Sequence, residues 1–174
     1  FVDSIVGGGG LISVPAMLLI KCGVIDDYSL IKCDFKIRIM ERLAINELLK
    51  WKNKQYRKPL IIEGARQVGK TWLVKEFARQ NYKQLAYVNF EEMKILQNLF
   101  EQDFSIPRIL TAIGAATNVT CTEGETLIFL DEIQAAPHAV TSLKYFAENA
   151  TGYHVIAAGS LLGIELHQGE SFPV

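Results

Sequence analysis

The chain has 174 residues, of which 49% are hydrophobic and 21% are charged, a composition that favours a packed globular domain and excludes an intrinsically disordered protein. This length accommodates one domain and little more. The formal net charge of -1 gives no global electrostatic argument for binding nucleic acid or an anionic membrane.

The cysteines and histidines do not form the patterns that staple small secreted domains or bind metals. Each type occurs three times and is scattered, as Cys22, Cys33, Cys121, His138, His154 and His167. Neither a disulfide framework nor a zinc site is predicted, and the cysteines suit a reducing compartment. We therefore expect a cytoplasmic location.

Residues 1–20 differ in character from the rest of the chain. They are apolar but include Asp3, four consecutive glycines and Pro15. Their number is close to the roughly 20 residues that a membrane span requires. No basic region precedes them, so a signal peptide is not supported. A membrane-inserting segment and a loosely packed apolar tail are equally compatible with this composition.

The same segment resembles the opening membrane segment of the sulfite-exporter permease family, whose members carry a similar D-S-x-x-G-G-G-G pattern before an apolar run with proline. The resemblance implies a chimera of a permease remnant and a soluble domain. One span cannot form a transport path, so transport is not predicted. Because the chain begins at Phe1 and ends at Val174, directly after Pro173, we expect a fragment of a larger reading frame.

A helical pattern follows residues 21–36, which lack a clear period and are interpreted as a linker. The apolar residues of this pattern recur at spacings of three and four, at Ile37, Met40, Ala44, Leu48 and Trp51. The basic stretch Lys50–Lys58 is interpreted as a solvated helix end and loop. Pro59 then marks the entry to a strand.

Leu60–Ile62 is a short apolar run typical of a buried parallel strand. The next segment, GARQVGKT, fits G-x-x-x-x-G-K-[ST], and a helical pattern follows it at once. Strand, glycine loop and helix in this order predict a loop that wraps a polyphosphate. The residues predicted to bind it are Gly64, Ala65, Arg66, Gln67, Val68, Gly69, Lys70 and Thr71.

The chemistry of phosphate binding explains this spacing. Gly64 and Gly69 have no Cβ to obstruct a tight turn, and the N–H groups of the loop point at anionic oxygens near the positive end of a helix dipole. Lys70 is expected to reach the β- and γ-phosphates, and the hydroxyl of Thr71 is expected to bind Mg²⁺.

Three further strands and three helices are predicted after the loop. The strands are Gln84–Phe90, Thr126–Glu132 and Tyr153–Ala158. Helical spacing covers Glu91–Gln102 and Ile106–Ala116, and a third helix carries Val140, Leu143 and Ala147. Ser105 is the expected N-cap before Pro107. Gly124 lies in a turn, and residues 161–174 are interpreted as a loop.

Two acids follow the apolar run that ends in Leu130. Asp131 is expected to lie at the carboxyl edge of the sheet and to order Mg²⁺ and its waters. Glu132 is expected to accept a proton from an attacking water, a role that contributes roughly 10²–10⁴ in rate. The competing interpretation is a pair of solvated acids at the end of a strand.

Two polar residues end the neighbouring strands. The hydroxyl of Ser160 is within reach of the γ-phosphate or the attacking water if adjacent strand ends converge. A small residue in a tight Gly-Ser turn explains it equally well. Asn89 is expected to hydrogen-bond Glu132 and hold it inactive, although an ordinary asparagine at a strand end is the more favoured interpretation.

Residues from about Ile37 to Val174 resemble the N-terminal part of a prokaryotic AAA+ superfamily ATPase, of the group in which the ATPase module precedes a C-terminal domain of unknown function. The matching stretches are LIIEGARQVGKTWLVKEF, AYVNFEE, TLIFLDEIQ, SLKYFAE, YHVIAAGSLLG and SFPV. The resemblance implies that Gly64–Thr71 is Walker A, that Asp131 and Glu132 are Walker B, that Ser160 is sensor 1 and that Asn89 is the switch residue.

The chain departs from this family by stopping early. The family continues into a fifth strand, a helical lid and the C-terminal domain, so no arginine finger or second sensor is assigned. Such a finger can come from a neighbouring subunit and is worth about 10³–10⁵ in rate. The resemblance therefore implies weak ATP binding and poor hydrolysis by the truncated chain alone.

The sequence as a whole predicts a three-layer α/β/α P-loop NTPase with a mostly parallel sheet. Its expected function is Mg²⁺-dependent ATP hydrolysis, with ATP and Mg²⁺ as ligands and a second copy or an unidentified protein as partner. The alternatives are a nucleotide-dependent binding switch with little turnover and a non-functional chimeric fragment. A phosphotransferase is less favoured because no acceptor site is marked.

Overall fold

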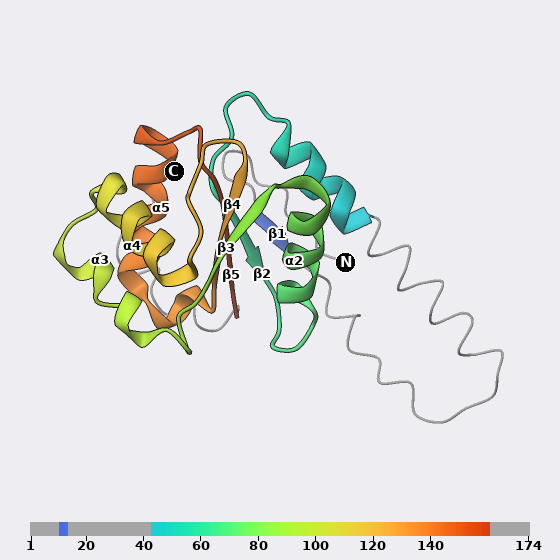
Figure 1. Ribbon diagram of the computed structural model, residues 1–174. Coiled ribbons are helices and arrows are strands. Elements are labelled where there is room, and N and C mark those ends of the chain that lie inside the picture. The colour runs from blue at the N-terminus through green and yellow to red at the C-terminus, as the bar shows by residue number, and fades with distance from the viewer. Residues whose placement is uncertain (1–10, 14–42, 161–174) are drawn as a thin grey trace.

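The computed structural model describes residues 11–13 and 43–160, which form one five-stranded parallel sheet with helices on both faces (Figure 1). The strand order is β1-β2-β5-β4-β3, and every pair of neighbouring strands is parallel. The strands are β1 (Leu11–Ser13), β2 (Leu60–Glu63), β3 (Gln84–Asn89), β4 (Thr126–Asp131) and β5 (His154–Gly159).

The central strands β4 and β5 are buried at every residue. Continuous apolar runs produce such strands because helices cover both faces of a parallel sheet. The four strands expected after Pro59 are therefore present, and no bound differs from the prediction by more than one residue.

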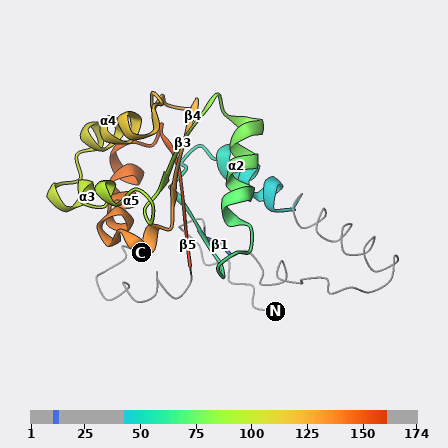
Figure 2. The same cartoon turned by 60° about the horizontal axis from the view of Figure 1, so that its bottom comes forward.

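The helices divide into two layers, which Figures 1 and 2 show on opposite sides of the sheet. A helix that includes residues 43–52 and α2 (Lys70–Asn81) cover one face. The helices α3 (Leu99–Gln102), α4 (Ile106–Thr117) and α5 (Pro137–Asn149) cover the other. This arrangement confirms the predicted three-layer α/β fold.

Each layer has its own apolar core. Phe77 and Val74 of α2 pack with Leu48 and Trp51 of the preceding helix, and all four side chains are buried. On the opposite face, the core includes Phe90, Phe100, Ile109, Ile113 and Phe146. Burial of a large apolar side chain contributes roughly 1.5–3 kcal/mol, so both faces of the sheet hold the helices in place.

A continuous helix over Glu91–Gln102 is wrong. The structure has a 3-10 helix, η2 (Lys94–Leu96), followed by the single turn of α3. Oδ1 of Asn89 accepts hydrogen bonds from the backbone N–H groups of Glu91 and Glu92, at 2.9 and 3.3 Å. Such a cap is compatible with a helix, but Met93 leaves the helical region with φ of −98° and ψ of 61°, so the backbone breaks there and the apolar spacing alone misled the prediction.

The edge strand β1 was not predicted. Its residues Leu11, Ile12 and Ser13 pair in parallel register with Ile61, Ile62 and Glu63 of β2. The proposed linker at residues 21–36, the loop at residues 161–174 and the remainder of residues 1–20 lie outside the described residues. Within residues 11–13 and 43–160, no helix has both the length and the apolar character needed to span a membrane.

Because they are parallel, the strands β2, β3, β4 and β5 end on the same side of the sheet, the lower side in Figure 1. Asn89 is paired with Asp131 between β3 and β4, and Glu63 is paired with Gly159 between β2 and β5. Ligands of open α/β sheets bind outside this edge, which is where the loop after β2 lies.

Candidate nucleotide-binding site

The loop of the site connects β2 to α2 and spans Gly64–Gly69. Two of its residues have left-handed backbone angles, with φ of 62° at Gln67 and 90° at Gly69. A Cβ at Gly69 would meet no atom within 4 Å, so glycine is favoured there by its backbone angle rather than by crowding. Gly69 is the N-cap of α2, and its carbonyl accepts from the N–H of Leu73 at 2.9 Å.

Lys70 folds back against this loop and is only 6% exposed. Its Nζ donates to the carbonyl oxygens of Gly64 and Ala65, at 2.9 and 2.8 Å. Burial lowers the pKa of Lys70, while the nearby carboxylates of Glu132 and Asp131 act in the opposite direction. A cation thus lies inside the loop, held by carbonyls that phosphate oxygens would replace.

The first turn of α2 contacts the end of β4 directly. Oγ1 of Thr71 donates a hydrogen bond to Oδ2 of Asp131 at 2.7 Å, and the residue Asp131 is 2% exposed. The two residues are sixty positions apart in the sequence. The sheet therefore brings the end of the loop and the first acid into the same site, as the strand order requires.

Asp131 accepts two further hydrogen bonds. The hydroxyl of Tyr87 donates to Oδ2 at 3.1 Å, and the backbone N–H of Glu132 donates to Oδ1 at 3.1 Å. Burial nevertheless raises the pKa of Asp131, because these donors, with Thr71, compensate only part of the cost of desolvation. Burial and Asp131 also raise the pKa of Tyr87 to about 12, so its hydroxyl remains a neutral donor.

Glu132 has an unusual backbone, and its side chain makes one polar contact among the residues that the structure describes. Its φ of 52° and ψ of 45° are left-handed, and the 3-10 helix η3 (Ile133–Ala135) begins immediately after it. Nε2 of Gln134 donates a short hydrogen bond to Oε2 of Glu132. Non-glycine residues with such angles are uncommon and cluster at functional sites.

Ser160 is connected to Glu132 by hydrogen bonds through Gln134, whereas Asn89 contacts Tyr87 and the turn after β3. The backbone N–H of Ser160 donates to Oε1 of Gln134 at 3.3 Å, so Ser160 is linked to Glu132 through one side chain. Nδ2 of Asn89 lies 3.5 Å from the hydroxyl of Tyr87, and its Oδ1 caps the turn after β3. Among the described residues, Asn89 makes no hydrogen bond to Glu132.

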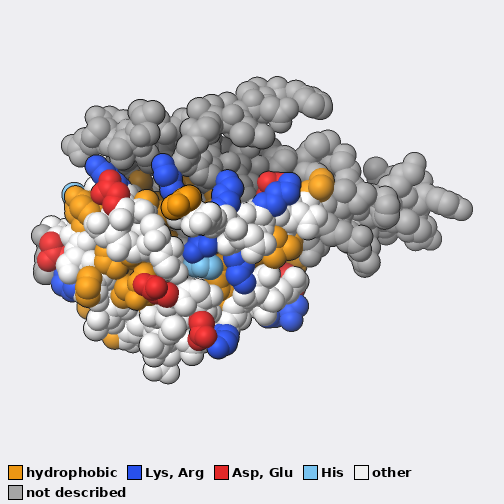
Figure 3. All heavy atoms as spheres, turned by 90° about the horizontal axis from the view of Figure 1, so that it is seen from above, with side chains coloured by type: hydrophobic (Ala, Val, Ile, Leu, Met, Phe, Trp, Pro, Cys, Tyr) orange, Lys and Arg blue, Asp and Glu red, His pale blue; other side chains and the backbone are white. Residues whose placement is uncertain are grey.

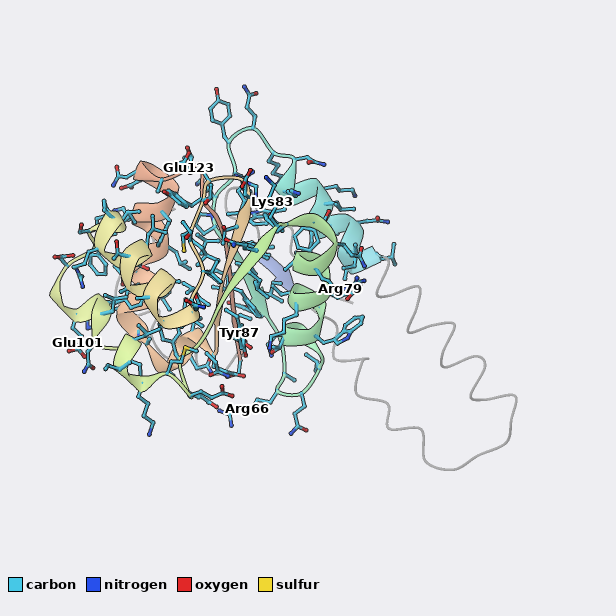
Figure 4. The ribbon with its side chains drawn as sticks, viewed as in Figure 1. Arg66, Arg79, Lys83, Tyr87, Glu101 and Glu123 are labelled. Atoms are coloured by element: carbon cyan, nitrogen blue, oxygen red, sulfur yellow. The ribbon has the colours of Figure 1, made fainter. Side chains whose placement is uncertain are left out.

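Arg66 is the exposed member of the loop. Its Nη2 donates to Oε1 of Glu91 at 3.1 Å, which links the loop to the turn after β3. Figure 4 shows Arg66 at the lower edge of the fold and Tyr87 above it. Both side chains of this ion pair are at least half exposed, so it contributes about 0–1 kcal/mol to stability.

The sequence analysis missed Tyr87 and Gln134. The alternation of Leu85, Tyr87 and Asn89 along β3 could have placed Tyr87 on the α2 face and near Asp131. No periodic pattern marks Gln134, because its position depends on the left-handed turn at Glu132.

The side-chain oxygens of Thr71 and Asp131 are suitable ligands for Mg²⁺. A hydroxyl and a carboxylate, those of Thr71 and Asp131, meet at hydrogen-bonding distance. Mg²⁺ prefers such hard ligands and takes few of them from protein, the remainder coming from phosphates and water. Among the residues that the structure describes, no group of three or more His, Cys, Asp or Glu side chains is placed to hold a metal ion.

Comparison with known proteins identifies the family. The family model described as "AAA domain" matches residues 56–174, more than half of the chain, and includes Gly64–Thr71, Asp131 and Glu132. No curated protein and no solved structure matches. The family implies nucleotide binding of the P-loop ATPase type, in agreement with the loop, the parallel sheet and the acidic strand end. The chain therefore belongs to the AAA domain family.

Proposed function

We propose that this chain binds ATP and Mg²⁺ through Gly64–Thr71 and Asp131 and hydrolyses the bond between the β- and γ-phosphates. The observation that carries the proposal is the 2.7 Å hydrogen bond from Thr71 to Asp131. It brings the end of a phosphate-binding loop to the acidic end of a buried strand. A chance loop motif would have no reason to meet such a carboxylate.

The loop supplies the binding of the nucleotide. Its backbone N–H groups and the N-terminus of the twelve-residue helix α2 favour an anion at this place. Lys70 already projects into the loop, so its ammonium exchanges the carbonyls of Gly64 and Ala65 for oxygens of the β- and γ-phosphates. The proposed binding thus requires a local exchange of hydrogen-bond partners.

Thr71 and Asp131 are the residues that would hold Mg²⁺. When bound, the ion neutralises charge that develops on the β- and γ-phosphate oxygens. The hydrogen bond between the two residues would open, and the hydroxyl of Tyr87 and the N–H of Glu132 would continue to orient the carboxylate of Asp131.

Glu132 is the proposed general base. A water oxygen attacks the γ-phosphorus, the bond from that phosphorus to the bridging oxygen breaks, and ADP and phosphate leave. The proton of the water passes to the carboxylate of Glu132, while Lys70 stabilises negative charge on the phosphates. Ser160, at the end of β5, is proposed to orient the water or the γ-phosphate with its hydroxyl. The contacts of Asn89 do not support its role as a switch.

The proposal is tested by binding and by phosphate release. A fluorescent ATP analogue with Mg²⁺ should bind saturably to the chain, and Lys70→Ala should lose this binding. Lys83→Ala is the matched control, because Lys83 forms an exposed ion pair with Glu125 at the opposite edge of the sheet. Glu132→Gln should keep binding and release phosphate about 10²-fold more slowly. Equal binding by the Lys70→Ala and wild-type chains would contradict the proposed site.

A nucleotide-dependent switch with little turnover is the second candidate. The observation that favours it is the hydrogen bond from Gln134, which already occupies the carboxylate of Glu132. A switch would bind Mg²⁺ and ATP and release phosphate equally slowly in the wild type and in Glu132→Gln. The same assay therefore separates the two functions.

A further inference from the structure

We propose that Gln134 is a positioning residue, which fixes the carboxylate of Glu132 and couples it to the end of β5. This inference rests on the proposed function, because it concerns the same base. It assigns the hydrogen bond to Glu132 that was expected of Asn89 to a residue on a different element, η3, two positions after Glu132, and it gives that hydrogen bond a positioning role and not an inhibitory one.

The contacts of Gln134 carry the proposal. Its side-chain amide uses both ends, since Nε2 donates to Oε2 of Glu132 and Oε1 accepts from the backbone N–H of Ser160. The two partners lie twenty-eight positions apart, the difference between 160 and 132. One side chain thus connects the end of β4 with the end of β5.

The orientation of this amide follows from its two partners. A carboxylate only accepts hydrogen bonds, and a backbone N–H only donates them. Rotating the amide by half a turn would set its oxygen against the carboxylate of Glu132 and its NH₂ group against the N–H of Ser160. Both contacts would then be repulsive, so a single orientation satisfies the bridge.

The backbone around Gln134 is well fixed. Ile133 and Ala136, on either side of it, are 1% and 3% exposed and belong to the core between the sheet and α5. The N–H groups of Ala135 and Ala136 donate to the carbonyls of Glu132 and Ile133, each at 2.9 Å. A side chain on such a segment restrains its partner more firmly than one on a free loop does.

The strand order places the bridge formed by Gln134 between the phosphate loop and the two acids. β5 lies between β2, which leads into the phosphate loop, and β4, which leads into the acids. Ser160 directly follows β5, so any shift of this strand end on nucleotide binding acts on Gln134 and hence on Glu132. The position of the base is therefore tied to the middle of the site.

The experiment compares two substitutions of Gln134 with a matched control. Gln134→Met removes both halves of the bridge at similar length. Gln134→Glu keeps an acceptor for Ser160 but replaces the donor to Glu132 with a second carboxylate. Gln80→Met is the control, because Gln80 makes the same amide–carboxylate contact, to Glu76, on the exposed part of α2.

The expected result is a loss of turnover without a loss of binding. Both Gln134 variants should keep the affinity for a fluorescent ATP analogue with Mg²⁺ within about twofold and lower kcat by at least about tenfold, part of what a positioned base contributes. Gln80→Met should change neither quantity. An unchanged kcat, a higher kcat, or an equal loss of affinity and kcat would overturn the proposal.

Hydrogen exchange at the Ser160 amide provides a readout that needs no activity. The exchange rate should rise in Gln134→Met, which lacks the acceptor, and should stay near the wild-type value in Gln134→Glu. A purely structural role would not separate the two variants in exchange while both lose turnover. Wild-type exchange in Gln134→Met would overturn the bridge, and circular dichroism establishes that each variant is folded.

The failure of this inference differs from that of the proposed function. If the wild type releases phosphate and the Gln134 variants do so equally well, the inference fails and the ATPase proposal stands. If the wild type binds nucleotide but releases none, the ATPase proposal fails, and the role of Gln134 in positioning a base fails with it, whatever the exchange rates show.

Discussion

The carboxylate of Asp131 illustrates how single residues are held at this site. Three donors surround it, from Thr71, Tyr87 and the backbone of Glu132, and its side chain is buried. A buried acceptor that loses a partner costs about 1–3 kcal/mol, and more when it is charged. The arrangement therefore fixes the direction of the carboxylate before any nucleotide arrives.

Tyr87 is the residue whose contribution to this arrangement is most easily tested. Tyr87→Phe should raise the Mg²⁺ concentration needed for half-maximal binding of an ATP analogue severalfold, because Asp131 loses one of its two side-chain donors. Binding without Mg²⁺ should be unchanged. The measurement is a Mg²⁺ titration of analogue binding, with Tyr145→Phe as the control, since Tyr145 stacks on Phe104 far from the loop. An unchanged Mg²⁺ dependence would contradict this role.

The residues of the site differ in how far sequence predicts them. Gly64–Thr71 are contiguous, so their arrangement depends on local geometry and their spacing is informative by itself. Asp131 and Glu132 were predicted because they follow a buried apolar run. Tyr87 and Gln134 depend on strand register and on a left-handed turn, neither of which single-sequence patterns record. Contacts across the sheet were thus the part that could not be predicted.

At the scale of elements, burial rather than helical spacing decided what formed. β4 and β5 are buried throughout, and continuous apolar runs of this length are typical of central strands in a parallel sheet. The segment after β3 has helical spacing over Glu91–Gln102 but forms two short pieces, and the backbone of Met93, with φ of −98° and ψ of 61°, is not helical. A non-helical backbone at one residue therefore interrupts the helix that this short periodic pattern predicted.

The helix α2 offers a direct test of burial within one element. Phe77 is fully buried and packs edge-to-face on Tyr82, whereas Trp72, on the same helix, is 55% exposed. Phe77→Ala should lower the free energy of unfolding by about 3–5 kcal/mol. Trp72→Ala should change it by less than about 1 kcal/mol. Urea unfolding of both variants measures these values, and similar losses would mean that the two faces of α2 are misassigned.

For the whole molecule, the two ends of the parallel strands differ: the candidate site lies at their carboxyl ends, and a cluster of aromatic and basic side chains lies at their amino ends. At the edge opposite the loop, Tyr82 and His154 are joined by a 2.6 Å hydrogen bond, and Trp51 packs edge-to-face on His154. Lys52 lies over the ring of Tyr82, 4.5 Å from its centroid. Figure 3 shows this face from above, with Lys and Arg side chains around a histidine. These contacts join α2, β5 and the helix that includes residues 43–52.

The short strand β1 is a part of the sheet that no local sequence pattern predicted. Its three residues extend the sheet beyond β2, although their apolar segment was interpreted without reference to the sheet. Pairing at an edge requires only a few extended residues with free backbone groups, and sequence does not specify which segment provides them. Topology beyond the motif-bearing strands therefore had to come from the structure.

His154 makes the stability of the whole molecule dependent on pH. Burial lowers its pKa from 6.5 to about 4, with smaller contributions in the same direction from Arg57 and Lys52. As the pH falls below about 6.5, the unfolded chain takes up a proton that the folded chain takes up only near pH 4. The unfolded state then binds more protons, so the free energy of unfolding falls by roughly 1.4 kcal/mol per pH unit across this range.

The variant His154→Gln isolates this effect, because glutamine keeps an acceptor for the hydroxyl of Tyr82 but does not titrate. Its unfolding free energy, measured in urea from pH 7.5 to 4, should fall less steeply below pH 6.5 than that of the wild type. The difference between the two curves removes the contributions of other groups, including Asp131. His138→Gln is the control, since it makes the same substitution at an exposed histidine on α5. Parallel curves for wild type and His154→Gln would show that the folded and unfolded chains take up this proton at the same pH, which would contradict the lowered pKa of His154.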